Sequence, residues 1–334
     1  MSDPTSSSDT IPAGAEGRAD AVGHRSAPRD PAERAAAEEA SAFSHAAVPP
    51  DATAAYGEHP DQVVDLYRPR PGAGVTRPGP LVVLLHGGAW RAAYDRTHVS
   101  PLAGLLARHG FAVASVEYRR GNGGTAAGRW PDTFDDVAAA VDAVPALAEA
   151  ALGADTVDVR RIVLTGHSAG GHLALWAAAR HVLPAGSRWY RPGAPALRGV
   201  VALAPIADLT AAVERDVCSG AVAELLGGAD LLAGRRAETD PSALLPTGIP
   251  VTVVHGDRDE VVPPQVAEAF AAASAKAGEE VQLTLLEGVG HFPVIDPAAA
   301  AAAVVAEEIG QLARWGVRPV GSSLRMTPVH RLRR

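Results

Sequence analysis

The chain has 334 residues, of which 47% are hydrophobic, so it carries enough apolar material for one large core or two smaller ones. Its formal net charge is −8, from 30 basic and 38 acidic residues. This mild acidity argues against a nucleic-acid partner, because nucleic-acid-binding surfaces are strongly basic. The single cysteine, Cys218, offers neither an internal disulfide nor a metal cluster, and we expect no metal and no cofactor.

Residues 1–55 have the composition of a disordered leader. Up to about residue 45 they are rich in Ser, Pro, Ala, Asp and Glu and carry almost no large apolar side chains, so burial cannot offset the entropy of ordering them. We expect at most a transient helix over Pro31 to Ala42, with order beginning near Tyr56. No secretory signal and no membrane-spanning apolar run is visible. The prediction is a cytoplasmic protein with no membrane partner.

Downstream of the leader, strand and helix patterns alternate, which predicts a mostly parallel, doubly wound α/β sheet with helices on both faces. The apolar run Leu81–Leu85 is typical of a strand that is covered on both faces. We assign this domain to residues 56–316. The predicted strands span 62–67, 81–85, 111–117, 162–165, 199–204, 251–254 and 281–286. The predicted helices span 99–108, 132–150, 171–179, 264–277 and 297–315.

Three segments show no regular pattern. A glycine-rich loop is expected over residues 121–130, and an irregular region over 206–250. Residues 317–334 contain five arginines and no acidic residue, which indicates a basic, flexible C-terminal tail.

The segment 166–170 reads Gly166-His167-Ser168-Ala169-Gly170 and follows a strand pattern directly before a helix pattern. A G-x-S-x-G in this context predicts a nucleophile elbow, in which a strained turn exposes the serine hydroxyl. Glycine is needed on both sides because a Cβ there would collide with the closely packed backbones. Ser168 is therefore the candidate nucleophile.

A serine nucleophile needs a base within hydrogen-bond reach and an acid to orient that base. In open α/β sheets such groups collect beyond the carboxyl ends of strands. Asp259 follows one predicted strand and His291 follows the next, and the order Ser168, Asp259, His291 is the one expected with this elbow. For the acid, the rivals are Asp257, which we expect to cap or tie the loop backbone, and Asp208, a weaker rival after its own strand. For the base, the rivals are His255, His172 and His167, which we expect to pack or to tie loops.

The segment His86–Trp90 follows the strand at 81–85 and supplies a candidate oxyanion hole. Consecutive glycines leave backbone N–H groups open to a substrate oxygen. The candidate donors are Gly87 and Gly88, with Ala89 as an alternative, and Ala169 across the elbow. A tight turn without a catalytic role is the competing interpretation.

The sequence also bears on the substrate pocket. Trp90 and Trp130 either line the pocket or are ordinary packing residues, and both interpretations stay open. The segment 206–250 is only moderately apolar and is interrupted by charged residues. A lid for long acyl chains should present a broad apolar face. We therefore expect a short or flat acyl group.

Four motifs in this order resemble those of the α/β-hydrolase superfamily, in the esterase/lipase branch that includes hormone-sensitive-lipase-like carboxylesterases and kynurenine formamidases. They are the segments 86–90, 166–171, 255–263 and 290–292. The resemblance implies a Ser168–Asp259–His291 triad and an oxyanion hole at Gly87 and Gly88. Ala89 replaces the third glycine of the lipase-type motif, a form that resembles kynurenine formamidases and related carboxylesterases.

The expected function is hydrolysis of short-chain or aryl carboxylic esters through an acyl-enzyme, with N-formylkynurenine hydrolysis as the alternative. The expected partner is thus a small-molecule ester or amide, and no feature predicts an oligomeric state. A prolyl-oligopeptidase-like peptidase is less consistent, because about 55 leader residues cannot build the usual propeller domain. A non-catalytic binding protein would be expected to lack a triad residue, and none is missing.

Overall fold

The computed structural model describes residues 30–70, 78–121 and 126–315. Within these ranges eight strands form a single sheet. All but the first overlap strands predicted above, although β5 begins five residues before its predicted start at Ile162. The strands are β1 (Ala52–Ala55), β2 (Val63–Tyr67), β3 (Gly79–Leu85), β4 (Ala112–Val116), β5 (Val157–His167), β6 (Gly199–Leu203), β7 (Val251–Gly256) and β8 (Val281–Leu286).

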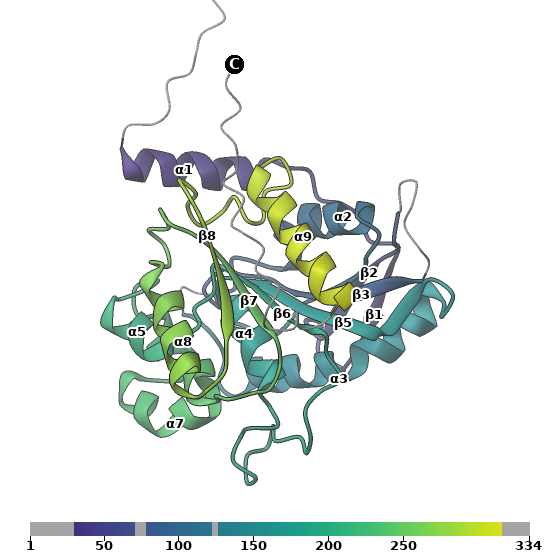
Figure 1. Cartoon of the computed structure of the whole chain (residues 1–334). Coiled ribbons are helices and arrows are strands. Elements are labelled where there is room, and N and C mark those ends of the chain that lie inside the picture. The colour runs from purple at the N-terminus through teal and green to yellow at the C-terminus, as the bar shows by residue number, and fades with distance from the viewer. Residues whose placement is uncertain (1–29, 71–77, 122–125, 316–334) are drawn as a thin grey trace, which may run out of the picture.

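The strand order is β1-β2-β4-β3-β5-β6-β7-β8, which confirms the predicted mostly parallel sheet. Strand β2 runs antiparallel to both of its neighbours, β1 and β4. Every other pair of neighbouring strands is parallel. The carboxyl ends of β3, β5, β7 and β8 therefore lie at the same edge of the sheet. The candidate motifs all follow these four strands, so the topology brings them to one edge (Figure 1).

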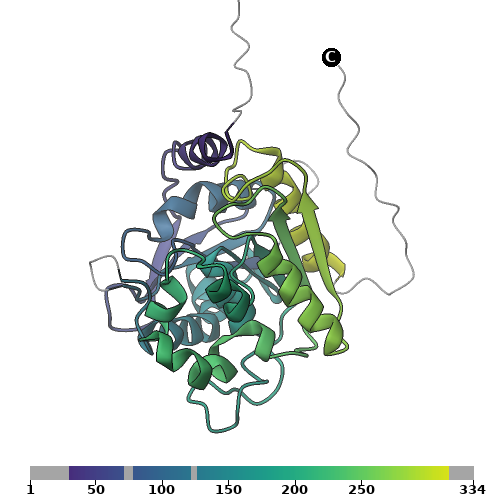
Figure 2. The ribbon, with the colours of Figure 1, turned by 90° about the vertical axis from the view of Figure 1, so that its left-hand side faces the viewer.

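Helices cover both faces of the sheet, as predicted (Figures 1 and 2). Two of them, α2 and α9, pack on one face, and α3, α4 and α8 pack on the other. Shorter helices follow β6, and one helix precedes β1. The helices are α1 (Pro31–Ala42), α2 (Ser100–Arg108), α3 (Asp132–Leu152), α4 (Ala169–Ala178), α5 (Leu209–Glu214), α6 (Ala221–Leu225), α7 (Leu232–Thr239), α8 (Gln265–Lys276) and α9 (Ala300–Trp315), with short 3-10 turns η1 (Arg96–Val99), η2 (Ala229–Leu231) and η3 (Pro241–Ala243).

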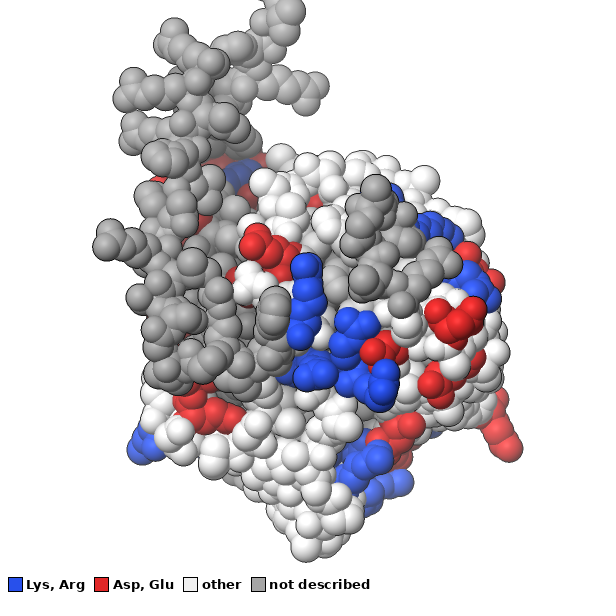
Figure 3. Space-filling view, turned by 45° about the vertical axis from the view of Figure 1, so that its right-hand side comes forward, with Lys and Arg blue, Asp and Glu red and all other residues white. Residues whose placement is uncertain are grey.

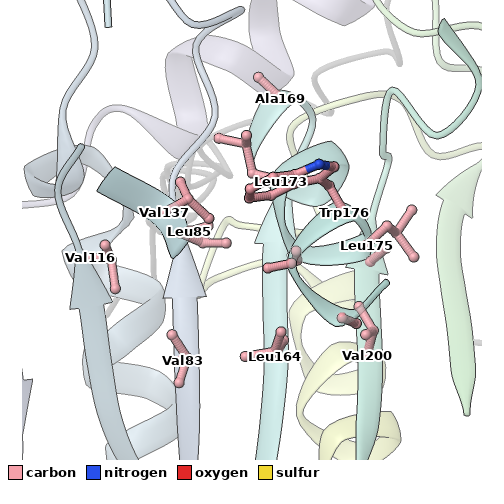
Figure 4. Packing of buried hydrophobic residues seen from close by; sticks show 14 of the residues in the cluster. Val83, Leu85, Val116, Val137, Leu164, Ala169, Leu173, Leu175, Trp176 and Val200 are labelled. Atoms are coloured by element: carbon pink, nitrogen blue, oxygen red, sulfur yellow. The ribbon is translucent and has the colours of Figure 1, made fainter. Parts of the chain in front are cut away.

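The core is divided between the two faces by the alternation of strand side chains. On β3, Val83 and Leu85 point toward α4, whereas Val82 and Leu84 belong to the cluster under α2 and α9. Figure 4 shows α4 lying over the sheet, with Leu173 among the side chains that face the strands. Full burial of such side chains contributes roughly 1.5–3 kcal/mol each. The serine elbow therefore lies between two buried elements, β5 and α4.

The prediction of a disordered leader is wrong for residues 30–55. Helix α1 is an ordered element with an Asp30 N-cap and Pro31 at its first position, and β1 pairs with β2 before Tyr56. The expected transient helix has the same bounds as α1, but only Ala42 of α1 is buried, so the composition gave no sign that the helix is fixed in place. The helix is fixed mainly by polar contacts, described below. Residues 1–29 of the predicted leader and the tail 317–334 lie outside the described residues.

The region 206–250 is more regular than predicted. It contains α5, α6 and α7, which are five to eight residues long. Helices this short are marginal alone and depend on tertiary contacts. Their larger apolar side chains, such as Leu209, Val222 and Leu225, belong to the main core.

Charged side chains of both signs share the face shown in Figure 3, where basic side chains gather beside acidic ones. No single-sign field covers that face. Among the described residues, no helix has the length and apolarity that a membrane crossing requires.

Candidate active site

Ser168 lies on a strained turn between β5 and α4. Its backbone has φ 55° and ψ −117°, a conformation that is costly for a residue with a side chain. A Cβ on Gly166 would overlap the backbone of Gly170, and a Cβ on Gly170 would overlap the carbonyl oxygen of Leu85. A side chain at either position would force these backbones to shift, which is the physical reason for the G-x-S-x-G spacing.

Asp259 and His291 form a buried hydrogen-bonded pair. The Nδ1 of His291 lies 2.7 Å from Oδ2 of Asp259, and the other carboxylate oxygen accepts the N–H groups of Val261 and Val262 at 2.9 and 2.8 Å. Burial by itself would raise the pKa of Asp259. The charge of His291 and hydrogen bonds from the rings of His291 and His255 outweigh burial and hold that pKa well below its usual range. Asp259 is therefore an anion that fixes the His291 ring and leaves Nε2 as the free ring nitrogen.

The loop that carries His291 is joined directly to the elbow. The Nε2 of His167, the residue before Ser168, lies 3.0 Å from the carbonyl oxygen of His291, and the two ring centroids are 4.5 Å apart. Burial, reinforced by the charge of His291, lowers the pKa of His167 well below its ordinary value. A neutral His167 thus donates to the His291 backbone and connects the two segments.

The rival carboxylates and histidines have structural partners, as the sequence suggested. Asp208 caps α5 by accepting the N–H of Ala211 at 2.8 Å, and Asp257 accepts the N–H of Gly288 at 2.7 Å. His172 bonds to the carbonyl oxygen of Thr239. None of these three contacts involves His291 or Ser168.

His255 has a second contact that the sequence did not indicate. Its Nε2 lies 2.8 Å from the carbonyl oxygen of Val262 and 3.3 Å from Oδ2 of Asp259. Histidines at positions 255 and 291 therefore face the same carboxylate. The spacing of four between His255 and Asp259, across the end of β7, was the signal that could have revealed this contact.

The segment after β3 packs against the elbow. A Cβ on Gly87 would lie 2.9 Å from the carbonyl oxygen of His167 and 3.4 Å from the Cβ of Ser168. Gly88 has φ 102°, and Ala89 and Trp90 also have positive φ values of 51° and 56°. This run of left-handed backbone is costly for the two non-glycine residues. Gly87 thus lies beside Ser168, and Gly88 packs against the side chain of Tyr94.

The ring of His86 orients the peptide group that joins Gly87 and Gly88. Its Nδ1 lies 2.8 Å from the carbonyl oxygen of Gly87. In a trans peptide the C=O and N–H groups point in opposite directions, so the N–H of Gly88 points away from the His86 ring. The arrangement can present that N–H to a bound oxygen.

Sequence reasoning missed the residues that fix His86. Its Nε2 lies 2.9 Å from Oε1 of Glu117, and its ring stacks on Tyr118 with centroids 4.3 Å apart. The hydroxyl of Tyr118 donates to the carbonyl oxygen of His86 at 2.6 Å. Burial would raise the pKa of Glu117, but His86, Arg120 and a backbone N–H lower it to about 2. The signal available was an acidic residue at the end of β4, the strand beside β3.

The two candidate pocket tryptophans have packing partners. Trp90 is fully buried and lies edge-on to His172, with centroids 5.3 Å apart. Trp130 is partly exposed, lies edge-on to Trp189 at 5.2 Å, and has the guanidinium of Arg235 4.1 Å from its ring centroid. Contact of either ring with a substrate stays a prediction.

Comparisons with known proteins give the family context. The sequence profile of the BD-FAE family matches residues 64–273. A probable isoprenylcysteine alpha-carbonyl methylesterase of Oryza sativa subsp. japonica is 29% identical over 248 residues, which cover 72% of this chain and 57% of that protein. The probable carboxylic ester hydrolase LipM of Mycobacterium tuberculosis is 33% identical over 129 residues, 38% of this chain and 28% of LipM. The matched region thus spans little more than half of the first relative and less of the second.

Solved structures agree on the fold. Esterase B from Lactobacillus rhamnosis, inhibited in that crystal structure, has a TM-score of 0.64 and 21% identity, with 84% of this chain and 92% of that chain covered. Esterase Est2 of Thermogutta terrifontis with bound propionate has a TM-score of 0.57 and 23% identity, with coverage of 81% and 96%. The predicted α/β-hydrolase fold of the esterase/lipase branch is confirmed.

Proposed function

The chain belongs to the BD-FAE family, and we propose that it is a serine hydrolase that cleaves short-chain or aryl carboxylic esters through an acyl-enzyme intermediate. The observation that carries the proposal is the buried Asp259–His291 pair beside a serine on a strained turn. Acyl transfer by a serine hydrolase requires a nucleophilic serine, an imidazole base and a carboxylate that orients the base.

In the proposed reaction, Ser168 Oγ attacks the ester carbonyl carbon while Nε2 of His291 accepts the serine proton. Asp259 stays ionised and stabilises the imidazolium that forms. Collapse of the tetrahedral intermediate breaks the bond to the alcohol, which leaves with the proton from His291. Water then repeats the sequence on the acyl-enzyme, giving the free acid and restoring Ser168.

The oxyanion is proposed to bind the N–H groups of Gly88 and Ala169, with Gly87 as a further donor. Gly87 packs against the elbow, and His86 turns the Gly88 N–H away from its own ring, so both observations support this role. Ala169 is the first residue of α4, where backbone N–H groups have no intrahelical acceptor. One such donor typically contributes on the order of 10²- to 10³-fold in kcat.

One observation bears on the type of bond that is cleaved, and a second bears on the size of the acyl group. The relatives named above are ester hydrolases, which does not favour the formamidase alternative. Most apolar side chains of α5 and α6 belong to the core, and Val213 is the large one that is exposed, so these helices do not form a broad apolar face for an alkyl chain. Each methylene bound in such a face would contribute about 0.8 kcal/mol.

A substrate series tests the proposal. The kcat/KM values would be measured for acetyl, butyryl and dodecanoyl p-nitrophenyl esters, for the methyl ester of an aryl acid, and for N-formylkynurenine. We expect the acetyl, butyryl or aryl ester to react fastest. A clear preference for the dodecanoyl ester would refute the short-acyl assignment. If N-formylkynurenine reacted faster than every ester, the proposed substrate would be a formamide and not an ester.

A further inference from the structure

Helix α1 lies against the loops that follow β7 and β8, at the edge where the candidate catalytic residues gather (Figures 1 and 2). Three side chains on one face of α1, spaced by four and three residues, make these contacts. Arg34 donates to the carbonyl oxygen of Arg258 at 3.3 Å, next to Asp259. Ser41 donates to Asp296 at 2.6 Å. Between them, Glu38 faces the loop of His291.

Glu38 contacts the residue that precedes His291. Its Oε1 accepts the N–H of Gly290 at 3.2 Å. Gly290 is buried, and a Cβ built there would meet Glu38 first, because its three nearest atoms all belong to the Glu38 carboxyl group. The carboxyl therefore packs directly on the Gly290 backbone. A buried N–H requires an acceptor, and the acceptor here comes from 252 residues away in the sequence.

With this bond, three side chains anchor the His291 segment, in addition to the backbone hydrogen bond from the N–H of Arg258 to the carbonyl oxygen of Val289 at 2.9 Å. Asp259 binds the ring at Nδ1, and His167 donates to the carbonyl oxygen of His291. The bond from Gly290 to Glu38 fixes the peptide on the other side of His291. The first two anchors act through candidate catalytic segments, and the third acts through α1.

We propose that Glu38 is a positioning residue, which fixes the His291 loop by accepting the N–H of Gly290 and so sets the base at the distance that proton transfer requires. This inference rests on the proposed function. A displacement of about 1 Å at a reacting group can cost on the order of 10²-fold in rate.

The N–H of Gly290 needs a hydrogen-bond acceptor, and this acceptor does not have to carry a charge. Burial is the main cause that raises the pKa of Glu38, and the Gly290 hydrogen bond and Arg34 offset it only in part. Oε2 of Glu38 is buried and has no hydrogen-bond partner among the described residues. A neutral glutamine keeps the Oε1 acceptor and the shape while it removes the cost of burying a carboxylate.

The test compares Glu38→Ala and Glu38→Gln in the full-length protein with Glu39→Ala and Glu39→Gln as matched controls on another face of α1. We expect Glu38→Ala to lower kcat about tenfold for the best ester of the series, with KM changed less than twofold. Glu38→Gln should stay within about twofold of wild type, as should both controls. Circular dichroism and thermal unfolding would establish that every variant is folded.

A double-mutant cycle sharpens the test. A methyl group in Gly290→Ala should displace the Glu38 carboxyl and lower kcat about as much as Glu38→Ala, and the double variant should lose little more than either single variant. The assignment is overturned if Glu38→Ala matches the Glu39 controls, if Glu38→Gln is as impaired as Glu38→Ala, or if the losses add in the double variant. A wild-type protein that hydrolyses no ester and no formamide would instead refute the proposed function.

Discussion

The segment that carries Ser168 lies at the centre of the sheet, whereas the loop that carries His291 follows the edge strand β8 and lies against α1. Around Ser168, position is set by backbone contacts: Gly166 and Gly170 leave no room for a Cβ, and α4 is buried along its length. Around His291, the backbone of Gly256 and Arg258 also contacts that of Val289, but the His291 ring and its two flanking peptide groups are fixed by the side chains of Asp259, His167 and Glu38.

The difference indicates how the two halves of the site tolerate change. A rigid turn cannot be altered without disturbing the core, but it needs no distant partner to stay in place. A loop fixed by hydrogen bonds can be altered without unfolding the sheet, and each lost bond should affect the rate more than the stability. Substitutions on the two sides should therefore separate into stability effects and kinetic effects.

The largest effect on the histidine side is expected from Asp259→Asn. The variant should stay folded and lose on the order of 10⁴-fold in kcat, because the neutral amide no longer steadies the imidazolium or selects the correct tautomer. Asp208→Asn is the control, since Asp208 only caps α5. Steady-state kinetics on both folded variants decide the matter, and a larger loss in Asp208→Asn would mean that the wrong carboxylate has been assigned.

The third part of the site, the segment 86–90, depends on Glu117, which fixes the ring of His86. The pKa of Glu117 is lowered from 4.5 to about 2, so it contributes up to about 3 kcal/mol of stability above pH 4.5, which is lost as the pH falls toward 2. Glu117→Gln should reduce the free energy of unfolding at pH 7 by up to that amount. Urea unfolding at several pH values should show the gap between wild type and variant narrowing below pH 4.5. A gap that is independent of pH would contradict the charge assigned to Glu117.

A smaller effect, on stability, is expected on the serine side. Gly170→Ala should lower the free energy of unfolding by roughly 1–3 kcal/mol, because its Cβ would overlap backbone carbonyl oxygens that cannot move independently. Gly186→Ala is the matched control, because a Cβ there meets nothing within 4 Å. Denaturant unfolding of the pair measures the difference, and equal stability would show that the elbow is less constrained than its geometry indicates.

The parts of the site that local sequence could predict are those fixed by local geometry and strand order. The strained turn at Ser168 depends on glycines two residues away on either side, and the pairing of Asp259 with His291 follows from the adjacency of β7 and β8. Asp257, His172 and His167 bind backbone groups as the sequence suggested.

The remaining parts depend on contacts between distant segments. Helix α1 buries only Ala42, and its contacts with Gly290 and Asp296 come from more than 250 residues away, so its composition resembled that of a disordered leader. Glu117 supports His86 only because β4 lies next to β3. Composition and periodicity carry no information about such pairings.

The central claim, that Ser168 is the nucleophile, is tested most directly by covalent labelling. A fluorophosphonate should phosphonylate Ser168 Oγ with loss of fluoride, and peptide mass spectrometry would locate the label. The rate of hydrolysis of the best ester should fall in proportion to the labelled fraction of the protein. Ser168→Ala should stay folded, take no label, and lose on the order of 10⁴- to 10⁶-fold in kcat. A label on another residue that abolishes activity, or a Ser168→Ala variant with more than about a tenth of wild-type kcat, would contradict the claim.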